Sequence, residues 1–254
     1  MNRVIAIANQ KGGVGKTTTT INLAAAIADK GLKVLILDLD PQGNTTSGLG
    51  VEKQELDKTA YQVLIGECPI ADTILKNVHE NVDLIPSNVD LAAAEVELVD
   101  LENQQFILKQ EMDQIKGNYE YVLIDCPPSL SMLTVNAMTA ASTVLVPIQC
   151  EYYALEGLSQ LMQTIDLVRE NLNPELKIEG MVFTMYDART NLSMQVVENV
   201  RSNITEHVYN TIIPRNIRLA EAPSHGLPIN QYEPKSSGAE AYRMLADEII
   251  DREI

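Results

Sequence analysis

A glycine-rich stretch near the start of the chain, KGGVGKTT at positions 11–18, contains the residue types that bind the phosphate groups of a nucleotide. Glycine has no Cβ, so backbone N–H groups can turn toward an anion. Lys16 supplies a full positive charge for the outer phosphates, and the Thr17 hydroxyl is a ligand for Mg²⁺. The residues predicted to contact the nucleotide in this stretch are Lys11, Gly12, Gly13, Val14, Gly15, Lys16, Thr17 and Thr18.

The stretch departs from the usual phosphate-loop pattern G-x-x-x-x-G-K-[ST] at two positions. Gln10 stands where that pattern has its first glycine, and Lys11 adds a second cation within the loop. Because Lys16 already serves one triphosphate, Lys11 needs another anion to neutralise. A nucleotide that a second subunit also contacts is such an anion, so the extra lysine favours a dimer.

Three aspartates lie at the ends of apolar runs. Asp38 and Asp40 follow the run at 34–37, and Asp125 follows the run at 121–124. Carboxylates beside a phosphate loop hold Mg²⁺ or position a water molecule. The predicted metal ligands are Thr17, Asp40 and Asp125. The predicted catalytic residues are Lys11, Lys16 and Asp40.

Strands that alternate with helices must position these residues. The runs at 4–8 and 33–38 are largely apolar, which is typical of strands buried on both faces, and residues 17–30 carry apolar side chains at helical spacing. The alternation predicts an α/β fold, with one doubly wound, mostly parallel sheet and helices on both faces. A single domain over residues 1–254 is expected, with ligands at the carboxyl ends of the strands.

Other segments have less distinctive patterns. We predict two short helices within residues 59–77, a long helix over residues 88–116, and a final helix from Ser236 to the end of the chain. Residues 212–218 are expected to form a loop beyond a strand.

Composition limits the class of protein. The chain has 254 residues, of which 45% are hydrophobic, and this is enough for one large α/β core. We expect no signal peptide and no membrane-spanning segment. Three cysteines without metal-type spacing suit a reducing cytoplasm. A formal charge of −16 argues against a protein that coats membranes or binds polyanions over its whole surface.

The loop and the strands that end in aspartate together resemble the ParA/MinD family of deviant Walker A ATPases, and most closely its small chromosomal ParA proteins. The resemblance implies a P-loop fold, ATP and Mg²⁺ as cofactors, and an ATP-dependent homodimer in which Lys11 reaches the partner's phosphates. It implies that Asp40 orients the attacking water and that Asp38 lies near the outer shell of the metal. Pro214 and Asn216 become candidate adenine contacts.

The same resemblance implies non-specific binding of double-stranded DNA, with Arg189 and then Arg218 as candidate contacts. Residues 186–218 contain four arginines and three acidic residues, so this segment has a net charge of +1 in a chain whose net charge is −16. The implied role is chromosome or plasmid segregation, with a ParB-type DNA-binding protein stimulating hydrolysis. The expected location is cytoplasmic and associated with the nucleoid.

Two alternatives remain open at this point. A MinD-like ATPase attaches to membranes through a basic C-terminal helix, but residues 246–254 hold four acidic residues and one arginine, so we expect no membrane binding. An ATP-dependent synthetase of the dethiobiotin type shares the phosphate loop. It would need further lysines or arginines for its substrate at the strand ends, and beyond Lys11 and Lys16 the sequence suggests none there.

Overall fold

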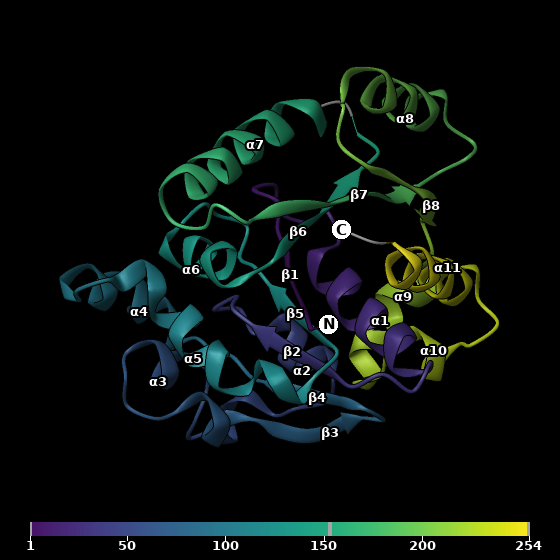
Figure 1. Cartoon of the computed structure of the whole chain (residues 1–254). Coiled ribbons are helices and arrows are strands. Elements are labelled where there is room, and N and C mark those ends of the chain that lie inside the picture. Colours follow the sequence, from purple (N-terminus) through teal and green to yellow (C-terminus); the bar gives the residue numbers. More distant parts are fainter. Residues whose placement is uncertain (1, 152–153, 253–254) are drawn as a thin grey trace.

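The sheet of this protein is mostly parallel, as the computed structural model shows for residues 2–252 apart from 152 and 153 (Figure 1). The strands are β1 (Arg3–Ile7), β2 (Val34–Asp38), β3 (Leu75–His79), β4 (Val82–Ile85), β5 (Tyr121–Asp125), β6 (Thr143–Gln149), β7 (Lys177–Tyr186) and β8 (Val208–Pro214). Their order in the described sheet is β3-β4-β2-β5-β1-β6-β7-β8, and only the β3–β4 pair is antiparallel. The predicted fold class is confirmed.

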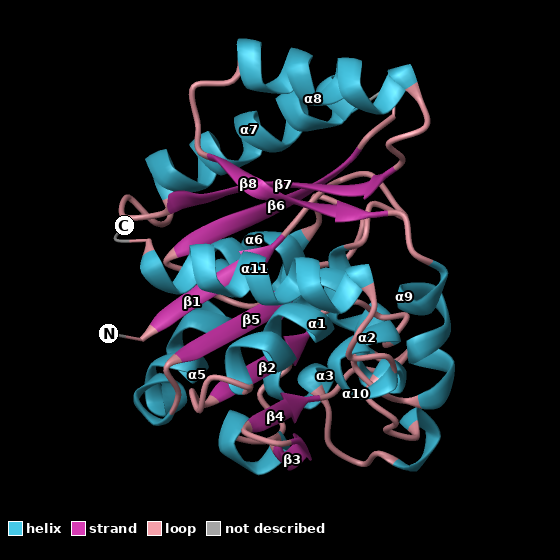
Figure 2. Cartoon of the chain, turned by 90° about the vertical axis from the view of Figure 1, so that its right-hand side faces the viewer, coloured by secondary structure: helices cyan, strands magenta, loops and turns pink. Residues whose placement is uncertain are grey.

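Helices cover both faces of the sheet (Figure 2). They are α1 (Lys16–Ala28), α2 (Asn44–Gly48), α3 (Ala60–Leu64), α4 (Leu91–Glu97), α5 (Ile107–Ile115), α6 (Met132–Ala140), α7 (Ala154–Asn171), α8 (Asn191–Asn203), α9 (Ile217–Glu221), α10 (Ile229–Tyr232) and α11 (Ser237–Asp251). No helix in the described part of the chain has the length and apolar character needed to cross a bilayer.

The central strands bury side chains on both faces, which explains their uninterrupted apolar sequences. In β1, Ile5 and Ile7 join the hydrophobic cluster that α1 and α11 cover, whereas Val4 and Ala6 join the cluster that α3 to α8 cover. The carboxyl ends of β1, β2 and β5 are in register at Ile7, Asp38 and Asp125. The aspartates therefore reach the same edge of the sheet as the phosphate loop.

The structure corrects the predicted long helix over residues 88–116. The helical segments are α4 and α5, and short 3₁₀ turns and non-helical residues lie between them. Asn103 has a left-handed φ of 55°, a conformation that asparagine tolerates better than most residues. Apolar spacing continues through this break, so periodicity alone did not reveal it.

Two other expectations were also wrong in part. The segment 59–77 contains one α-helix, α3, and a 3₁₀ turn, but its end begins the antiparallel strand β3 instead of a helix. Residues 212–214 belong to β8 and α9 starts at Ile217, so the predicted late loop is reduced to Arg215 and Asn216. Parallel pairing with β7 extends the strand further than its sequence suggested.

The outer edge of β8 is covered by a side chain from α11. Both carboxylate oxygens of Glu248 accept hydrogen bonds from strand amides, from Asn210 N at 2.9 Å and from Thr211 N at 2.8 Å. This contact ties the last helix to the last strand.

Candidate functional site

The glycine-rich loop joins β1 to α1. Gly13 and Gly15 have left-handed φ values of 73° and 90°, and α1 begins at Lys16, so the helix N-terminus adds partial positive charge. A Cβ built on Gly13 would have no heavy atom within 4 Å, which leaves open space over the loop. The described loop therefore has the geometry of a phosphate cradle.

Lys16 is held within the loop that it serves. Its side chain is buried, and its Nζ donates a hydrogen bond to the carbonyl oxygen of Lys11 at 3.2 Å. Burial lowers the pKa of Lys16, and the negative charge of Asp125 opposes that shift. The ammonium group is therefore placed over the loop and lies in the field of a carboxylate.

Asp125 and Thr17 meet at the base of the loop. The Thr17 hydroxyl donates to Asp125 Oδ2 at 2.8 Å, and the Thr45 hydroxyl donates to the same oxygen at 2.6 Å. The other oxygen, Asp125 Oδ1, is buried and has no hydrogen-bond partner in the described structure. A buried carboxylate oxygen without a donor is suited to a cation, and hydroxyl and carboxylate oxygens are the ligands that Mg²⁺ prefers.

The protein supplies only part of a metal coordination shell. In the described residues no three histidine, cysteine, aspartate or glutamate side chains converge on one metal position. Mg²⁺ usually keeps several waters and binds nucleotide phosphates in addition to one or two protein ligands, so this donor set fits Mg²⁺. The predicted ligands Thr17 and Asp125 are brought together here.

Asp38 and Asp40 have different surroundings. Asp38 is fully buried and accepts hydrogen bonds from Asp40 N, Thr46 N and the Thr46 hydroxyl. Burial, and then the neighbouring charge of Asp125, raise the pKa of Asp38. Asp40 is mostly buried and accepts a bond from Gln42 N at 2.9 Å. The structure thus uses Asp38 to hold the loop that carries Asp40.

Two residues of this site were missed from the sequence. Thr45 and Thr46 at the start of α2 bind the carboxylates of Asp125 and Asp38. The signal available was a pair of hydroxyl residues just after Gly43, which has a left-handed φ of 58° and turns the chain back over the strand ends. A threonine pair after such a turn is common, and its partners depend on the folded loop.

Lys11 lies at the outer surface of the loop. Its Nζ is 2.9 Å from Glu151 Oε2 of the same chain, and both side chains are partly exposed. The neighbouring Gly12 has space around it, because a Cβ built there would meet only Pro128 Cβ at 3.9 Å. Within one chain, nothing in the described structure brings Lys11 to the position of Lys16.

A cavity of about 570 Å³ opens beside the phosphate loop. Gly15 and Thr18 form its wall on the side of the loop, and Pro214, Asn216 and Tyr242 line it from the C-terminal part of the chain. The Asn216 amide is already engaged, because its Oδ1 accepts from Arg218 N and its Nδ2 donates to Ser237. The cavity therefore adjoins the phosphate loop directly.

The two candidate DNA contacts lie outside this site, and both are paired. Arg189 donates from Nε and Nη2 to the two oxygens of Asp187, at 2.8 and 2.6 Å, although 86% of its side chain is exposed. Arg218 pairs with Glu221 at 2.7 Å. Exposed ion pairs of this kind contribute about 0–1 kcal/mol, so a phosphate group can compete for either arginine.

Comparison with known proteins agrees with this geometry. A family model described as an AAA domain matches residues 2–178. The sporulation initiation inhibitor protein Soj of Bacillus subtilis (strain 168) is 53% identical over 249 residues, which cover 98% of both chains. The chromosome-partitioning ATPase Soj of Treponema pallidum (strain Nichols) is 47% identical, covering 100% of this chain and 99% of its own.

Solved structures share the fold. A structure of cobyrinic acid a,c-diamide synthase from Mycobacterium smegmatis with bound ADP and magnesium has a TM-score of 0.88 and 39% identity, over 98% of this chain and 94% of that chain. Taken together with the two Soj proteins and the phosphate loop, this shows that the chain belongs to the ParA/MinD family of P-loop ATPases, in its chromosome-partitioning Soj branch.

Proposed function

We propose that this ATPase partitions DNA, and that its ATP-bound form is a face-to-face dimer that binds DNA and is released by hydrolysis. ATP and Mg²⁺ are its cofactors. The observation that carries the nucleotide chemistry is the buried Asp125 Oδ1, which has no donor in the described structure and lies on the carboxylate that Thr17 contacts. Such an oxygen beside a phosphate cradle fits a magnesium nucleotide.

Each residue of the site has a distinct task in this proposal. Lys16 binds the outer phosphates, while Thr17 and Asp125 hold Mg²⁺, which neutralises charge on the phosphate oxygens when bound. Asp40 orients the attacking water, with Asp38 fixing the loop that presents it. Turnover of the chain alone is slow, because an aspartate that positions water is a modest catalyst without a supplied arginine.

The dimer depends on Lys11, which crosses to the partner's phosphates in this proposal. Two magnesium nucleotides repel one another unless a cation lies between them. The Lys11–Glu151 pair is partly exposed and therefore weak, so phosphates can replace Glu151. A Gly12→Val variant retains ATP binding and fails to dimerise, because a Cβ at this position fits within the free chain and the added methyl groups take up space that the partner subunit needs.

DNA binding follows dimerisation, because a dimer doubles the number of arginines that face the phosphate backbone. Arg189 and Arg218 give each chain only a few phosphate contacts, and affinity rises steeply with the number of phosphates neutralised. A ParB-type protein stimulates hydrolysis and so releases the dimer. The proposed location is the nucleoid in the cytoplasm.

Membrane attachment is not part of this proposal. The apolar side of α11 is used within the fold, where Leu245 and Ile249 are fully buried, and Glu248 is engaged with β8. Sedimentation with anionic liposomes tests this point, and ATP-dependent pelleting would favour a MinD-like role.

Light scattering, ATP turnover and DNA binding together test the proposal. We expect light scattering to give a doubled mass with ATP, and ATP turnover to rise when non-specific duplex DNA is added. Arg189→Ala should abolish DNA association and leave ATP binding intact, whereas Asp40→Ala should dimerise and persist on DNA. Equal DNA binding by Arg189→Ala and by the wild type would refute the assigned contact.

A second candidate is an amide synthetase, favoured by the 39% identity to the chain described as cobyrinic acid a,c-diamide synthase. A substrate with many carboxylates needs several cations around its pocket. Among the described residues that line the cavity, Arg215 is the one charged side chain. Turnover that depends on cobyrinic acid and an amide donor, and not on DNA, would select this alternative.

A further inference from the structure

The outer side of α4 carries an apolar stripe that the fold does not use. Ala92, Ala93 and Val96 lie on α4, Val89 lies in the turn before the helix, and Val99 lies in the 3₁₀ turn after it. All five are exposed, and we call them the α4 outer face. The three valines expose 73%, 74% and 63% of their surface. Isolated exposed apolar residues are ordinary, but these recur at helical spacing along one short segment.

The opposite side of the same helix explains its packing. Leu91, Ala94 and Leu98 are completely buried and belong to the hydrophobic cluster on that side of the sheet. These residues fix the rotation of the helix, so the α4 outer face is not required to anchor it. In Figure 1, α4 lies at the left margin of the molecule, beyond α3 and α5.

The charged residues within the segment that carries the stripe have one sign. Residues 88–104 contain five carboxylates and no lysine or arginine. At 100° per residue, Asp90 and Glu97 lie along one flank of the stripe and Glu95 lies along the other. This arrangement repels a second copy of the same face, and it also repels an anionic membrane.

We propose that the α4 outer face binds an amphipathic helix of another protein, with an apolar stripe for the valines and lysines or arginines for the flanking carboxylates. Packing of two amphipathic helices needs apolar contacts at successive turns, and the charges along the flanks determine partner choice. No described residue of the face lines the nucleotide cavity. We therefore expect binding to occur without ATP.

The probe is a fluorescein-labelled peptide of 18 residues with leucines on one helical face and lysines on the rest. Fluorescence anisotropy is measured on the full chain without nucleotide. Val96→Ser weakens binding at least about tenfold, the effect of removing one buried valine contact. Met244→Ser on α11 is the matched control, since Met244 is also an exposed apolar residue, and it changes affinity less than about twofold.

Charge is tested with a peptide in which glutamate replaces every lysine, and this peptide should not bind. Unchanged ATP turnover and thermal melting of Val96→Ser show that the variant is folded. Equal affinity of the lysine peptide for Val96→Ser and the wild type overturns the proposal, as does a requirement for ATP.

Two other occupants of the face are separate outcomes. If Val96→Ser abolishes a concentration-dependent increase in mass of the wild type, the face binds a second copy and the proposal is wrong. If Val96→Ser abolishes binding to phosphatidylglycerol vesicles, the occupant is a membrane and the proposal is again wrong.

Discussion

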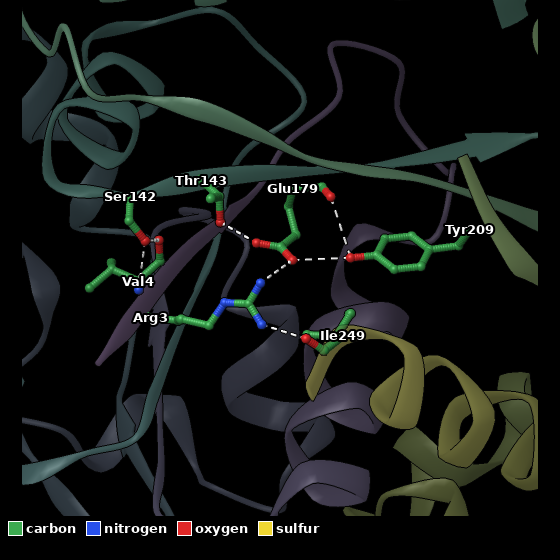
Figure 3. Close-up of polar contacts among 7 residues, drawn as sticks. All are labelled: Arg3, Val4, Ser142, Thr143, Glu179, Tyr209 and Ile249. Carbon is green, nitrogen blue, oxygen red and sulfur yellow. Dashed lines mark hydrogen bonds and ion pairs between the residues drawn. The ribbon is translucent and has the colours of Figure 1, made fainter. Parts of the chain in front are cut away.

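Two buried carboxylates, Asp125 and Glu179, lie at opposite ends of the parallel strands of the sheet, and their surroundings differ. Both are completely excluded from solvent. Asp125 ends β5 at the carboxyl edge, near Asp38, and one of its oxygens has no donor in the described structure. Glu179 lies near the start of β7 at the amino edge, and both of its oxygens accept hydrogen bonds (Figure 3).

The partners of Glu179 come from three different strands. Arg3 Nη2 and the Tyr209 hydroxyl each donate to Oε1 at 3.0 Å, and the Thr143 hydroxyl donates to Oε2 at 2.6 Å. Arg3 also donates to the carbonyl oxygen of Ile249 in α11. The network in Figure 3 therefore joins β1, β6, β7 and β8 to the last helix.

The difference separates a carboxylate that stabilises the fold from one that is available for a ligand. A buried charge is tolerated when a counterion and donors satisfy it, as Arg3 does for Glu179. Asp125 lacks this complete set and lies beside a like charge at Asp38. Burial raises the pKa of Asp125, while the hydroxyls of Thr45 and Thr17 lower it. Mutations at the two carboxylates should therefore separate stability from turnover.

The largest expected effect is on stability at the amino edge. Glu179→Ala leaves the Arg3 guanidinium buried without its counterion, and we expect the free energy of unfolding to fall by about 3–5 kcal/mol. Urea denaturation measures this change. ATP turnover per folded molecule should remain within about twofold of the wild type, because Glu179 is far from the phosphate loop along the strands. A large loss of turnover would show that Glu179 does not act on stability alone.

The next effect is on turnover at the carboxyl edge. Asp125→Asn keeps an acceptor for Thr17 but removes the charged metal ligand, so turnover should fall at least about a hundredfold, or about 2.7 kcal/mol. Phosphate release measures the rate. Thermal melting should show equal or higher stability, because one of two neighbouring carboxylates has been neutralised. If the Asp125→Asn protein were less stable and had normal turnover, Asp125 would be the carboxylate that stabilises the fold.

The smallest effect is a pH dependence of stability without nucleotide. The folded pKa of Asp38 is raised above its usual value to about 7, so its contribution is present below the unfolded pKa and is lost as the pH rises through about 7. The free energy of unfolding should therefore fall as the pH rises toward 7, and Asp125, whose pKa is also raised, to about 6, contributes to the lower part of this fall. Asp38→Asn should flatten this profile in urea titrations, and an equally steep profile would assign the effect to other groups.

The sequence predicts the parts of the site that are local in the chain. The loop glycines, Lys16 and Thr17 are adjacent, and Asp38 and Asp125 end strands whose apolar runs are unmistakable. The parallel sheet follows from the same runs. The positions of Lys11 and Asp40 in the reaction remain predictions, since their roles depend on groups beyond one free chain.

Contacts between distant segments could not be predicted. Lys11 and Glu151 are separated by 140 positions, and Arg3 and Glu179 by 176. Neither pair can be recognised from its spacing in the sequence, because any acidic residue at a strand end could be the partner of the cation. The break at Asn103 was hidden for the opposite reason, since the apolar period continues across a local change of backbone conformation.

The contact of Glu248 with β8 has a consequence for aggregation. An edge strand with free amides is a template on which another chain can add a strand, and this leads to aggregation. Glu248 occupies the amides of Asn210 and Thr211, so incoming backbone finds no donors at that place. A neighbouring chain therefore cannot add a strand at these two residues without first displacing Glu248.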